Sequence, residues 1–422
     1  MSTAPKAQSP FKPARRIASL PVPATIAMAE RVRQLRAEGR DVISLAIGQP
    51  DFPSPAVALE GAVREVREGH TGYPPLAGQK PLREAVQAKF RRDNGLDFPL
   101  AHIMVANGGK QLIFNAFMAS VEDGDEIVVP APYWVSYPLI AGMFGGKAVE
   151  VPCYEADGFR PRAEALRAAM NERTKWLVLN FPNNPTGAIL ERSDLEAIAA
   201  VLRDFPNVMV MSDEIYEHLT FDGRKPVSLL NVAPDLAGRV LIVNGVSKAY
   251  AMTGWRVGFA AGPEPLIKAM IRAQGNATSG ICTLAQGGAQ AALQSPMEGV
   301  ERMRAVYQER RDKVVPRLRA MKGLSCAMPE GAFYAFPGMK ALKGHLTAGG
   351  RTIDSDVAFT EALLEEAHLA TVPGSAFGQA DHFRLSFAAS DKELEEACAR
   401  LERFTASLRP ASLRPASHQM PR

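Results

Sequence analysis

The chain has few cysteines, and its cysteines and histidines lack the spacings that are typical of metal-binding motifs. Its four cysteines, Cys153, Cys282, Cys326 and Cys398, are far apart, and none forms a CxxC pair. The seven histidines show neither HxxxH nor HExxH spacing. This pattern argues against a zinc site and a secreted disulfide framework, and it fits reduced thiols in a cytosol. We therefore expect a cytoplasmic protein without a metal site.

Long apolar runs and concentrated charge are absent as well. No stretch is apolar over the length that spans a bilayer, and no apolar core of a secretion signal follows the basic N-terminal residues. The net charge is only +4 over 422 residues, without a Lys/Arg-rich run interleaved with aromatics. We therefore expect neither a membrane nor a nucleic acid as a partner.

What the chain does have is enough apolar sequence for a large core. Hydrophobic residues make up 46% and charged residues 22%, as in an ordinary globular protein. Residues 1–20 are rich in Pro, Ala, Ser and basic side chains, which predicts a flexible N-terminal arm. Residues 405–422 repeat ASLRP twice, which predicts a disordered tail.

Between these tails, short apolar runs alternate with helical patterns. Helical stretches such as residues 192–205, with Ser193 expected as the N-cap, separate runs that read as strands buried on both faces. Those runs are residues 125–130, 175–182, 207–214 and 239–245. The alternation predicts an α/β fold with a mainly parallel sheet that is sandwiched by helices.

The pattern changes after about residue 290. A long charged helical pattern over residues 297–321 leads into the strand-like pieces GAFYAFPG and HFRLSFAAS. This predicts a smaller α+β domain over residues 297–404, beside a large domain over residues 55–296. A helical pattern at residues 25–38 indicates that the segment 21–54 joins the small domain, which would then be discontinuous.

Polar side chains follow three of the predicted strands. Asn184 follows the run 175–182, Asp213 stands at the end of the run 207–214 with Tyr216 after it, and Lys248 follows the run 239–245. Taken singly, each fits a turn, a helix cap or a solvated strand end. Ligands of open α/β sheets bind at the carboxyl ends of the strands, so the set together predicts a ligand site.

A further element begins with two glycines. In VANGGKQLIFNAFMASV, Gly108 and Gly109 open an amphipathic helical pattern. Bare N–H groups at such a helix N-terminus attract a phosphate. The Walker pattern is absent and no GxGxxG follows a strand, so a single phosphate is favoured, with Arg256 as a charged clamp.

Nine motifs in a fixed order are similar to those of a known family. They resemble the pyridoxal-phosphate-dependent aminotransferases of fold type I, and within them the bacterial aspartate aminotransferase branch that also contains prephenate aminotransferases. The likeness runs from about residue 24 to residue 403. The motifs are GQPDFPSP, GYPPLAGQKPLREAV, GGKQ, PAPYWVSYP, NFPNNPTG, SDEIYEHL, SKAYAMTGWRVGF, GAFY and FRLSFA.

The resemblance implies catalytic roles around pyridoxal 5′-phosphate. Lys248 would form the Schiff base with the cofactor and move the proton at the substrate. Asp213 would pair with the pyridine N–H, and Tyr216 and Asn184 would hydrogen-bond the phenolic oxygen. Trp134 would stack on the ring.

The same resemblance implies binding roles. The phosphate would be held by Gly108, Gly109, Ser247 and Arg256, with Lys110 beside it and Tyr73 reaching in from a neighbouring subunit of a homodimer with shared active sites. The substrate α-carboxylate would be held by Arg384 beside Gly48, with Trp134 and Asn184 bordering it. Lys110 and Thr25 would meet the distal carboxylate of a dicarboxylic substrate.

The implied reaction moves an amino group between aspartate or glutamate and a 2-oxo acid, such as 2-oxoglutarate or oxaloacetate, by a ping-pong mechanism. Aromatic or other amino donors, a C–S or β-lyase reaction, and a non-catalytic regulator on the same fold remain alternatives.

Four positions depart from the pattern of the relatives. Pro21 stands where prephenate-using relatives carry a lysine, and Pro23 replaces a common small hydroxyl residue. Gln49 stands where many relatives have a glutamate. Gly245 stands where many relatives have a phosphate-binding serine, which predicts the loss of one phosphate contact.

Overall fold

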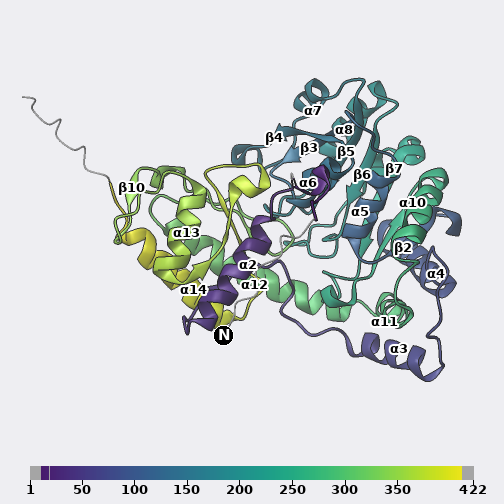
Figure 1. Cartoon of the computed structure of the whole chain (residues 1–422), viewed down its shortest axis with the longest axis horizontal. Coiled ribbons are helices and arrows are strands. Elements are labelled where there is room, and N and C mark those ends of the chain that lie inside the picture. Colours follow the sequence, from purple (N-terminus) through teal and green to yellow (C-terminus); the bar gives the residue numbers. More distant parts are fainter. Residues whose placement is uncertain (1–10, 19, 411–422) are drawn as a thin grey trace, which may run out of the picture.

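A seven-stranded sheet forms the centre of a large domain, with a smaller domain beside it (Figure 1). The computed structural model describes residues 11–18 and 20–410. In spatial order the strands are β2 (Ile103–Ala106), β8 (Gly258–Ala261), β7 (Val240–Gly245), β6 (Met209–Asp213), β5 (Thr174–Asn180), β3 (Glu126–Ala131) and β4 (Lys147–Pro152). In this sheet only β8 runs in the direction opposite to the other six strands. The predicted α/β fold with a mainly parallel sheet is confirmed.

Both faces of the sheet are buried because apolar side chains point alternately to either side. In β3, Val128 packs into one core, whereas Ile127 and Val129 pack into the core on the opposite face. The first face is covered by α4 (Lys80–Lys89), α7 (Ala163–Ala169), α8 (Arg192–Asp204), α9 (Leu229–Val232) and α11 (Thr283–Gln294). The second face is covered by α5 (Gly109–Met118), α6 (Ser136–Met143) and α10 (Glu264–Ala277). Helix α3 (Ala56–Arg67) packs on α11 at the edge of the domain (Figure 1).

The start of α8 corrects one prediction. The N-cap is Glu191 and not Ser193, which lies inside the first turn. The backbone N–H of Glu191 donates to the Asp194 carboxylate at 2.8 Å, so an acidic side chain closes this helix end.

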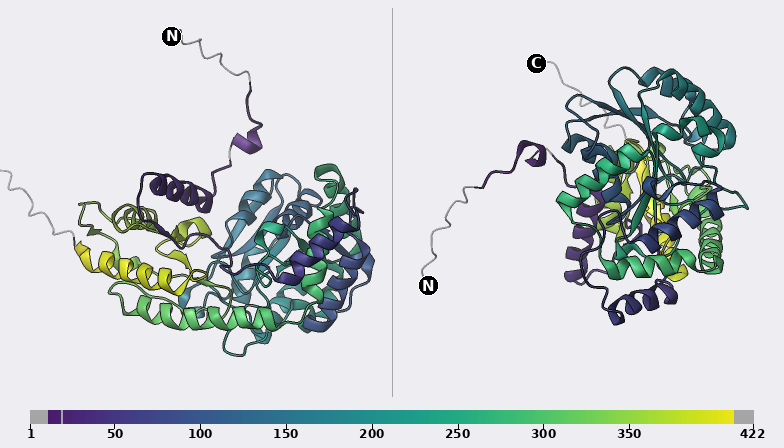
Figure 2. Two further views of the ribbon diagram at one scale, coloured as in Figure 1. Left: turned by 90° about the horizontal axis from the view of Figure 1, so that it is seen from below. Right: turned by 90° about the vertical axis from the view of Figure 1, so that its right-hand side faces the viewer.

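The small domain has its own core and its own sheet. Helix α12 (Glu298–Ala320) runs along both domains and joins them (Figure 2). A three-stranded antiparallel sheet follows, in the order β12 (Val372–Pro373), β13 (Phe383–Ser386) and β9 (Tyr334–Ala335). Helices α13 (Asp356–Ala367) and α14 (Asp391–Ser407) pack against each other and against α12 or the strands.

The N-terminal segment reaches the same domain. Strand β1 (Ile43–Ser44) pairs in parallel with β11 (Leu369–Ala370), and α2 (Ala24–Ala37) packs near β12. Before it, α1 (Arg15–Ala18) is a single exposed turn within the predicted arm. Residues 1–10 and 19 of that arm lie outside the described residues.

The predicted C-terminal tail begins too early. Helix α14 continues to Ser407, and β14 (Arg409–Pro410) pairs with β10 (His345–Leu346). The buried side chains of Phe404 and Thr405 hold this last turn against the core. The prediction of disorder is therefore wrong for residues 405–410, and residues 411–422 lie outside the described residues.

Candidate active site

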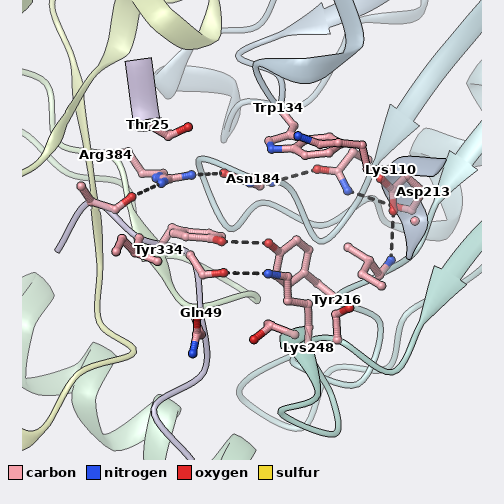
Figure 3. Close-up of a pocket in the computed structure, with 18 of the residues that line it drawn as sticks. Thr25, Gln49, Lys110, Trp134, Asn184, Asp213, Tyr216, Lys248, Tyr334 and Arg384 are labelled. Carbon is pink, nitrogen blue, oxygen red and sulfur yellow. Dashed lines mark hydrogen bonds between the residues drawn. The ribbon is translucent and has the colours of Figure 1, made fainter. Parts of the chain in front are cut away.

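A cavity of about 490 Å³ opens where the strands of the large sheet end, between the two domains (Figure 3). Strands β3, β5, β6 and β7 end close to it, which is the position expected for a ligand site in an open α/β sheet. Within the described part of the chain, no cluster of three or more potential metal ligands occurs, and no helix is both long and apolar enough to cross a membrane.

Twelve of the predicted site residues line this one cavity. They are Thr25, Gly48, Gly109, Lys110, Trp134, Asn184, Asp213, Tyr216, Ser247, Lys248, Arg256 and Arg384. Gly108 directly precedes the cavity wall as the N-cap of α5. Tyr73 does not line it: its side chain is 93% exposed and borders a separate depression with residues 278–284. Its predicted reach into a neighbouring subunit stays a prediction.

The N-terminus of α5 forms a cradle that fits a phosphate. Gly108 has a φ of 83°, which glycine adopts without strain, and a Cβ placed there would lie 2.5 Å from Nη2 of Arg256. Arg256 donates to the carbonyl of Asn107 at 3.4 Å, which holds its cationic head beside the bare N–H groups. Buried Ser247 adds a hydroxyl to the same wall. A positive helix end, a guanidinium and a hydroxyl are the donors that a phosphate requires.

The backbone around Gly245 is closely packed, and the predicted loss of a phosphate contact at this position stays a prediction. A Cβ at this position would lie 2.8 Å from the Val257 carbonyl oxygen and 3.1 Å from the Gly258 Cα. Because β7 and β8 pair so closely here, the backbone leaves no room for a serine side chain.

Asp213 lies at the end of β6 and is fully enclosed. Its side chain is 5% exposed, accepts a hydrogen bond of 2.6 Å from the Tyr137 hydroxyl, and accepts a second of 3.3 Å from the backbone N–H of Ile215. Burial raises the pKa of Asp213 to about 6, although Tyr137, Ile215 and the charge of Lys248 act in the opposite direction. Such a carboxylate would gain from a cationic partner inside the cavity.

Lys248 lies after β7, where its amine turns into the cavity. Its Nζ donates to the Gly48 carbonyl at 2.6 Å, as Figure 3 shows. Burial, together with the nearby charges of Arg384 and Arg256, lowers the pKa of Lys248 to about 8, although the charge of Asp213 acts in the opposite direction. A lysine closer to neutrality at physiological pH is a better nucleophile toward a carbonyl carbon.

Arg384 on β13 approaches from the small domain and is only 2% exposed. Its Nη1 donates to the Asn184 side chain at 2.8 Å, and its Nη2 donates to the Ala46 carbonyl at 2.6 Å. Its buried Nε has no hydrogen-bond partner among the described residues. A planar guanidinium in this position can take a carboxylate in a two-point contact.

A chain of amide groups ties these strand ends together. The side chain of Asn180 donates to the Asp213 carbonyl at 3.1 Å and accepts from the backbone N–H of Asn184 at 3.0 Å. Arg384 and the enclosed Asp213 are therefore connected through the ends of β5 and β6.

The opposite wall carries Lys110 and Trp134. The Lys110 Nζ lies 4.9 Å from the centre of the Trp134 ring system. Partial loss of solvent around this amine and the charge of Arg256 lower the pKa of Lys110. Lys110 has no carboxylate partner in the described chain within ion-pair distance, and Thr25 of α2 faces the cavity from the small-domain side (Figure 3).

The sequence interpretation missed two tyrosines of this site. Tyr137 holds Asp213, and Tyr334 on β9 lines the cavity with its hydroxyl 2.8 Å from that of Tyr216. Both lie within recognised motifs, PAPYWVSYP and GAFY. Their spacing in the sequence does not indicate whether their hydroxyls face a core or the cavity, because a buried aromatic residue most often belongs to a core.

The fold and the cavity define a class of enzyme, and the comparisons with known proteins agree. Residues 40–401 match the family model of class I and II aminotransferases, and the chain belongs to that family. It is an aminotransferase, and the resemblance found in the motifs is confirmed.

Individual relatives cover nearly the whole chain. The aspartate/prephenate aminotransferase of Cereibacter sphaeroides is 46% identical, over 91% of this chain and 96% of the relative. The aspartate aminotransferase of Rhizobium meliloti strain 1021 is 44% identical, over 94% and 96%. A crystal structure of the aspartate aminotransferase from Rhizobium meliloti aligns with a TM-score of 0.92 at 43% identity, covering 94% of this chain and all of that one. A Thermus thermophilus aspartate aminotransferase structure with maleate gives a TM-score of 0.87 at 40% identity, over 93% and 99%.

Proposed function

We propose that this aminotransferase uses pyridoxal 5′-phosphate and moves an amino group between aspartate or glutamate and a 2-oxo acid, namely 2-oxoglutarate or oxaloacetate, in a ping-pong cycle. The observation that carries the proposal is the position of Lys248. Its amine, with a lowered pKa, lies in the same cavity as the enclosed Asp213 and the carboxylate fork Arg384.

The residues present fit this cofactor group by group. The cradle of Gly108, Gly109, Ser247 and Arg256 would hold the phosphate. Asp213 would hold a proton on the pyridine nitrogen, and Tyr216 and Asn184 would donate to the phenolic oxygen, with Trp134 against the ring face. When bound, the cofactor supplies an electron sink for a carbanion at the substrate Cα.

Lys248 would carry the cofactor covalently and then move the substrate proton. The free amine of Lys248 would then be the base next to the substrate Cα. Its lowered pKa suits this task because a base whose pKa lies near the working pH both accepts and returns a proton. In the structure, the amine donates a hydrogen bond to the Gly48 carbonyl, on the side of the cavity where the substrate would bind.

The substrate class follows from the cations of the cavity. Arg384 would take the α-carboxylate, and Lys110 with Thr25 would meet a second carboxylate at the other end of the substrate. The names of the relatives support a dicarboxylic substrate, since several are called aspartate aminotransferases and one structure is described with maleate, a dicarboxylate. Prephenate also has two carboxylates and appears in the name of the Cereibacter relative. Pro21 and Pro23 are the positions at which we expect prephenate use to be decided.

A half-reaction panel tests the proposal. Cofactor-loaded protein is mixed with one amino acid at a time, without a keto acid, and the cofactor absorbance is followed. We expect aspartate and glutamate to convert the aldehyde form to the amine form, and 2-oxoglutarate and oxaloacetate to reverse the change. Faster conversion by aromatic amino acids would overturn the substrate assignment. Release of pyruvate from cysteate or cystathionine without any keto acid would favour the lyase alternative.

We also propose a homodimer in which Tyr73 completes the site of the neighbouring subunit. The exposed position of Tyr73 and a row of exposed apolar residues on α3 support it: Leu59, Val63 and Val66 are 53%, 45% and 53% exposed. Sedimentation should give twice the chain mass, and Tyr73→Phe should weaken cofactor binding. A monomer with full activity would contradict this.

A further inference from the structure

Tyr334 occupies a position between the two halves of the site. It lies on β9 of the small domain and is 1% exposed. Its hydroxyl oxygen lies 2.8 Å from that of Tyr216, which comes from the large domain. The Arg384 guanidinium lies 4.6 Å from the centre of its ring. Figure 3 shows Tyr334 between the two, with its hydroxyl directed at Tyr216.

Resting on the function proposed above, we propose that Tyr334 is a further positioning residue of the active site. Its hydroxyl donates to Tyr216 and so directs the proton of Tyr216 toward the phenolic oxygen of the cofactor, while its ring supports Arg384 under the substrate carboxylate. One side chain would thus serve the cofactor and the substrate separately.

The direction of the hydrogen bond follows from the charges nearby. Each hydroxyl has a single proton, and Tyr216 can donate to the cofactor only if it accepts from Tyr334. The cation of Arg384 over the ring favours Tyr334 as the donor, because a nearby positive charge makes a phenol more acidic. Two hydroxyls in series polarise each other, so the outer donor strengthens the inner bond.

Charged and titratable groups face this pair from several elements. Arg384 approaches from β13, Asp213 from the end of β6 and Lys248 from beyond β7, while Tyr137 of α6 adds its hydroxyl next to Asp213. The Lys248 Nζ lies 5.9 Å from the centre of the Tyr216 ring. None of these groups lies within hydrogen-bond distance of the Tyr216 hydroxyl. Within the described chain, its hydrogen-bond partner is the Tyr334 hydroxyl.

Tyr334 also packs against the backbone of Gly48. A Cβ at Gly48 would lie 2.0 Å from the Tyr334 hydroxyl oxygen, so the tyrosine packs directly on this backbone. The same short segment offers the Ala46 carbonyl to Arg384 and the Gly48 carbonyl to Lys248. The ring therefore supports Arg384, whereas the contact with the Gly48 backbone involves the hydroxyl as well as the ring.

The test separates the hydroxyl from the ring. Tyr334→Phe removes only the hydroxyl, and Tyr334→Leu removes both. Tyr307→Phe is the matched control, because Tyr307 is equally buried in the same core and its hydroxyl, 3.4 Å from Asp51, does not face the cavity. Melting temperatures of the cofactor-free proteins verify that each variant is folded.

The main readout is the pH midpoint of the visible absorbance of the cofactor-loaded protein, without substrate. A donor to the phenolic oxygen stabilises the form that has lost its proton, so weakening that donor raises the midpoint. We expect a rise of about 0.5 pH unit in Tyr334→Phe, a larger rise in Tyr216→Phe, and none in Tyr307→Phe. The KM for 2-oxoglutarate should stay within about twofold in Tyr334→Phe and rise about tenfold in Tyr334→Leu, because only the leucine removes the support of Arg384.

An unchanged midpoint in Tyr334→Phe, with a shifted one in Tyr216→Phe, would overturn the role of the hydroxyl while the proposed function stands. Equal KM values in the two Tyr334 variants would overturn the role of the ring. A wild-type protein that shows no lysine-linked visible band with pyridoxal 5′-phosphate would refute the proposed function itself, and this inference with it.

Discussion

Two groups of charged residues lie on either side of the segment 213–218, one in the interior of the large domain and one in the cavity between the domains, and they are built in opposite ways. The segment 213–218 contributes to both: Asp213 and Tyr216 face the cavity, whereas Glu214 and Glu217 face the interior. We call the interior group of Lys89, Asn94, Glu217 and Asn244 the inner network. The charges of the inner network are paired within the chain and contribute to stability. Those of the cavity are positioned to bind a ligand.

In the inner network every charge has a partner in the chain. Lys89 is 1% exposed and forms an ion pair with Glu217. The Glu217 carboxylate also accepts from Asn94 at 2.7 Å and from Asn244 at 2.6 Å, and Lys89 donates to Asn94 at 2.7 Å. A buried charge that is paired and fully hydrogen-bonded is tolerated.

The cavity is different, since its cations outnumber its carboxylates. Among the described residues, five cationic ones line it, namely Arg33, Lys110, Lys248, Arg256 and Arg384, against the single carboxylate of Asp213. This excess of positive charge suits ligands that bring a phosphate and one or two carboxylates. The two groups therefore predict opposite responses when a charge is removed.

The largest effect concerns Lys248 and function. Lys248→Ala should lower turnover by at least about 10⁴-fold, because no other amine of the described chain donates to Gly48 in this cavity. The melting temperature of the cofactor-free protein should not fall. Steady-state assays and calorimetry measure the two quantities, and near-normal turnover would refute the assignment.

The next effect concerns Glu217 and stability. Glu217→Ala should lower the free energy of unfolding by about 3–5 kcal/mol, since it leaves the Lys89 charge buried without a partner. The double variant Lys89→Met, Glu217→Leu should recover most of that loss, because it removes both charges together. Denaturant unfolding measures all three proteins. A Glu217→Ala protein as stable as the wild type would mean that the inner network contributes no stability.

Removing a cavity charge should instead stabilise the cofactor-free protein. The pKa of Lys248 is lowered from 10.5 to about 8 in the folded state. Below pH 8 both folded and unfolded chains hold this proton, so the full cost of enclosing the charge is present. As the pH rises from 8 to 10.5 the folded chain loses the proton first, and stability increases.

Lys248→Met removes that cost. We expect it to be more stable than the wild type by about 2 kcal/mol at pH 7, a value reduced for the partial exposure of the residue. The difference should vanish above pH 10.5. Denaturant titrations across this range test it, and a difference that grows with pH would contradict the account.

The smallest effect concerns the support of Asp213. Tyr137→Phe removes the hydrogen bond that opposes the rise in the pKa of Asp213. A carboxylate that protonates more readily pairs less well with a pyridinium, so we expect cofactor binding to weaken about fivefold, or ~1 kcal/mol. Fluorescence titration with pyridoxal 5′-phosphate measures it. Tyr133→Phe, whose hydroxyl instead meets Glu150, is the control.

Sequence reasoning succeeded where function depends on the end of a strand. Apolar runs between helical patterns predict β5, β6 and β7. The residues at or just after their ends, Asn184, Asp213 and Lys248, line one cavity because the carboxyl ends of parallel strands lie at one edge of the sheet. The paired glycines likewise located the N-terminus of α5.

It failed where function depends on which way a buried side chain points. Tyr137 and Tyr334 are aromatic residues within apolar surroundings, and only tertiary packing shows that their hydroxyls meet Asp213 and Tyr216. The predicted end of the small domain lies before the true end of α14 for a related reason. The polar repeat that follows predicts disorder, but Phe404 and Thr405 are buried against the rest of the small domain.

The most direct test of the central claim is to locate the cofactor on the chain. The wild-type protein is loaded with pyridoxal 5′-phosphate, reduced with borohydride, digested, and mapped by mass spectrometry. The account predicts a single modified peptide with the reduced cofactor on Lys248. A cofactor on Lys110 instead, or none retained on any lysine, would contradict it.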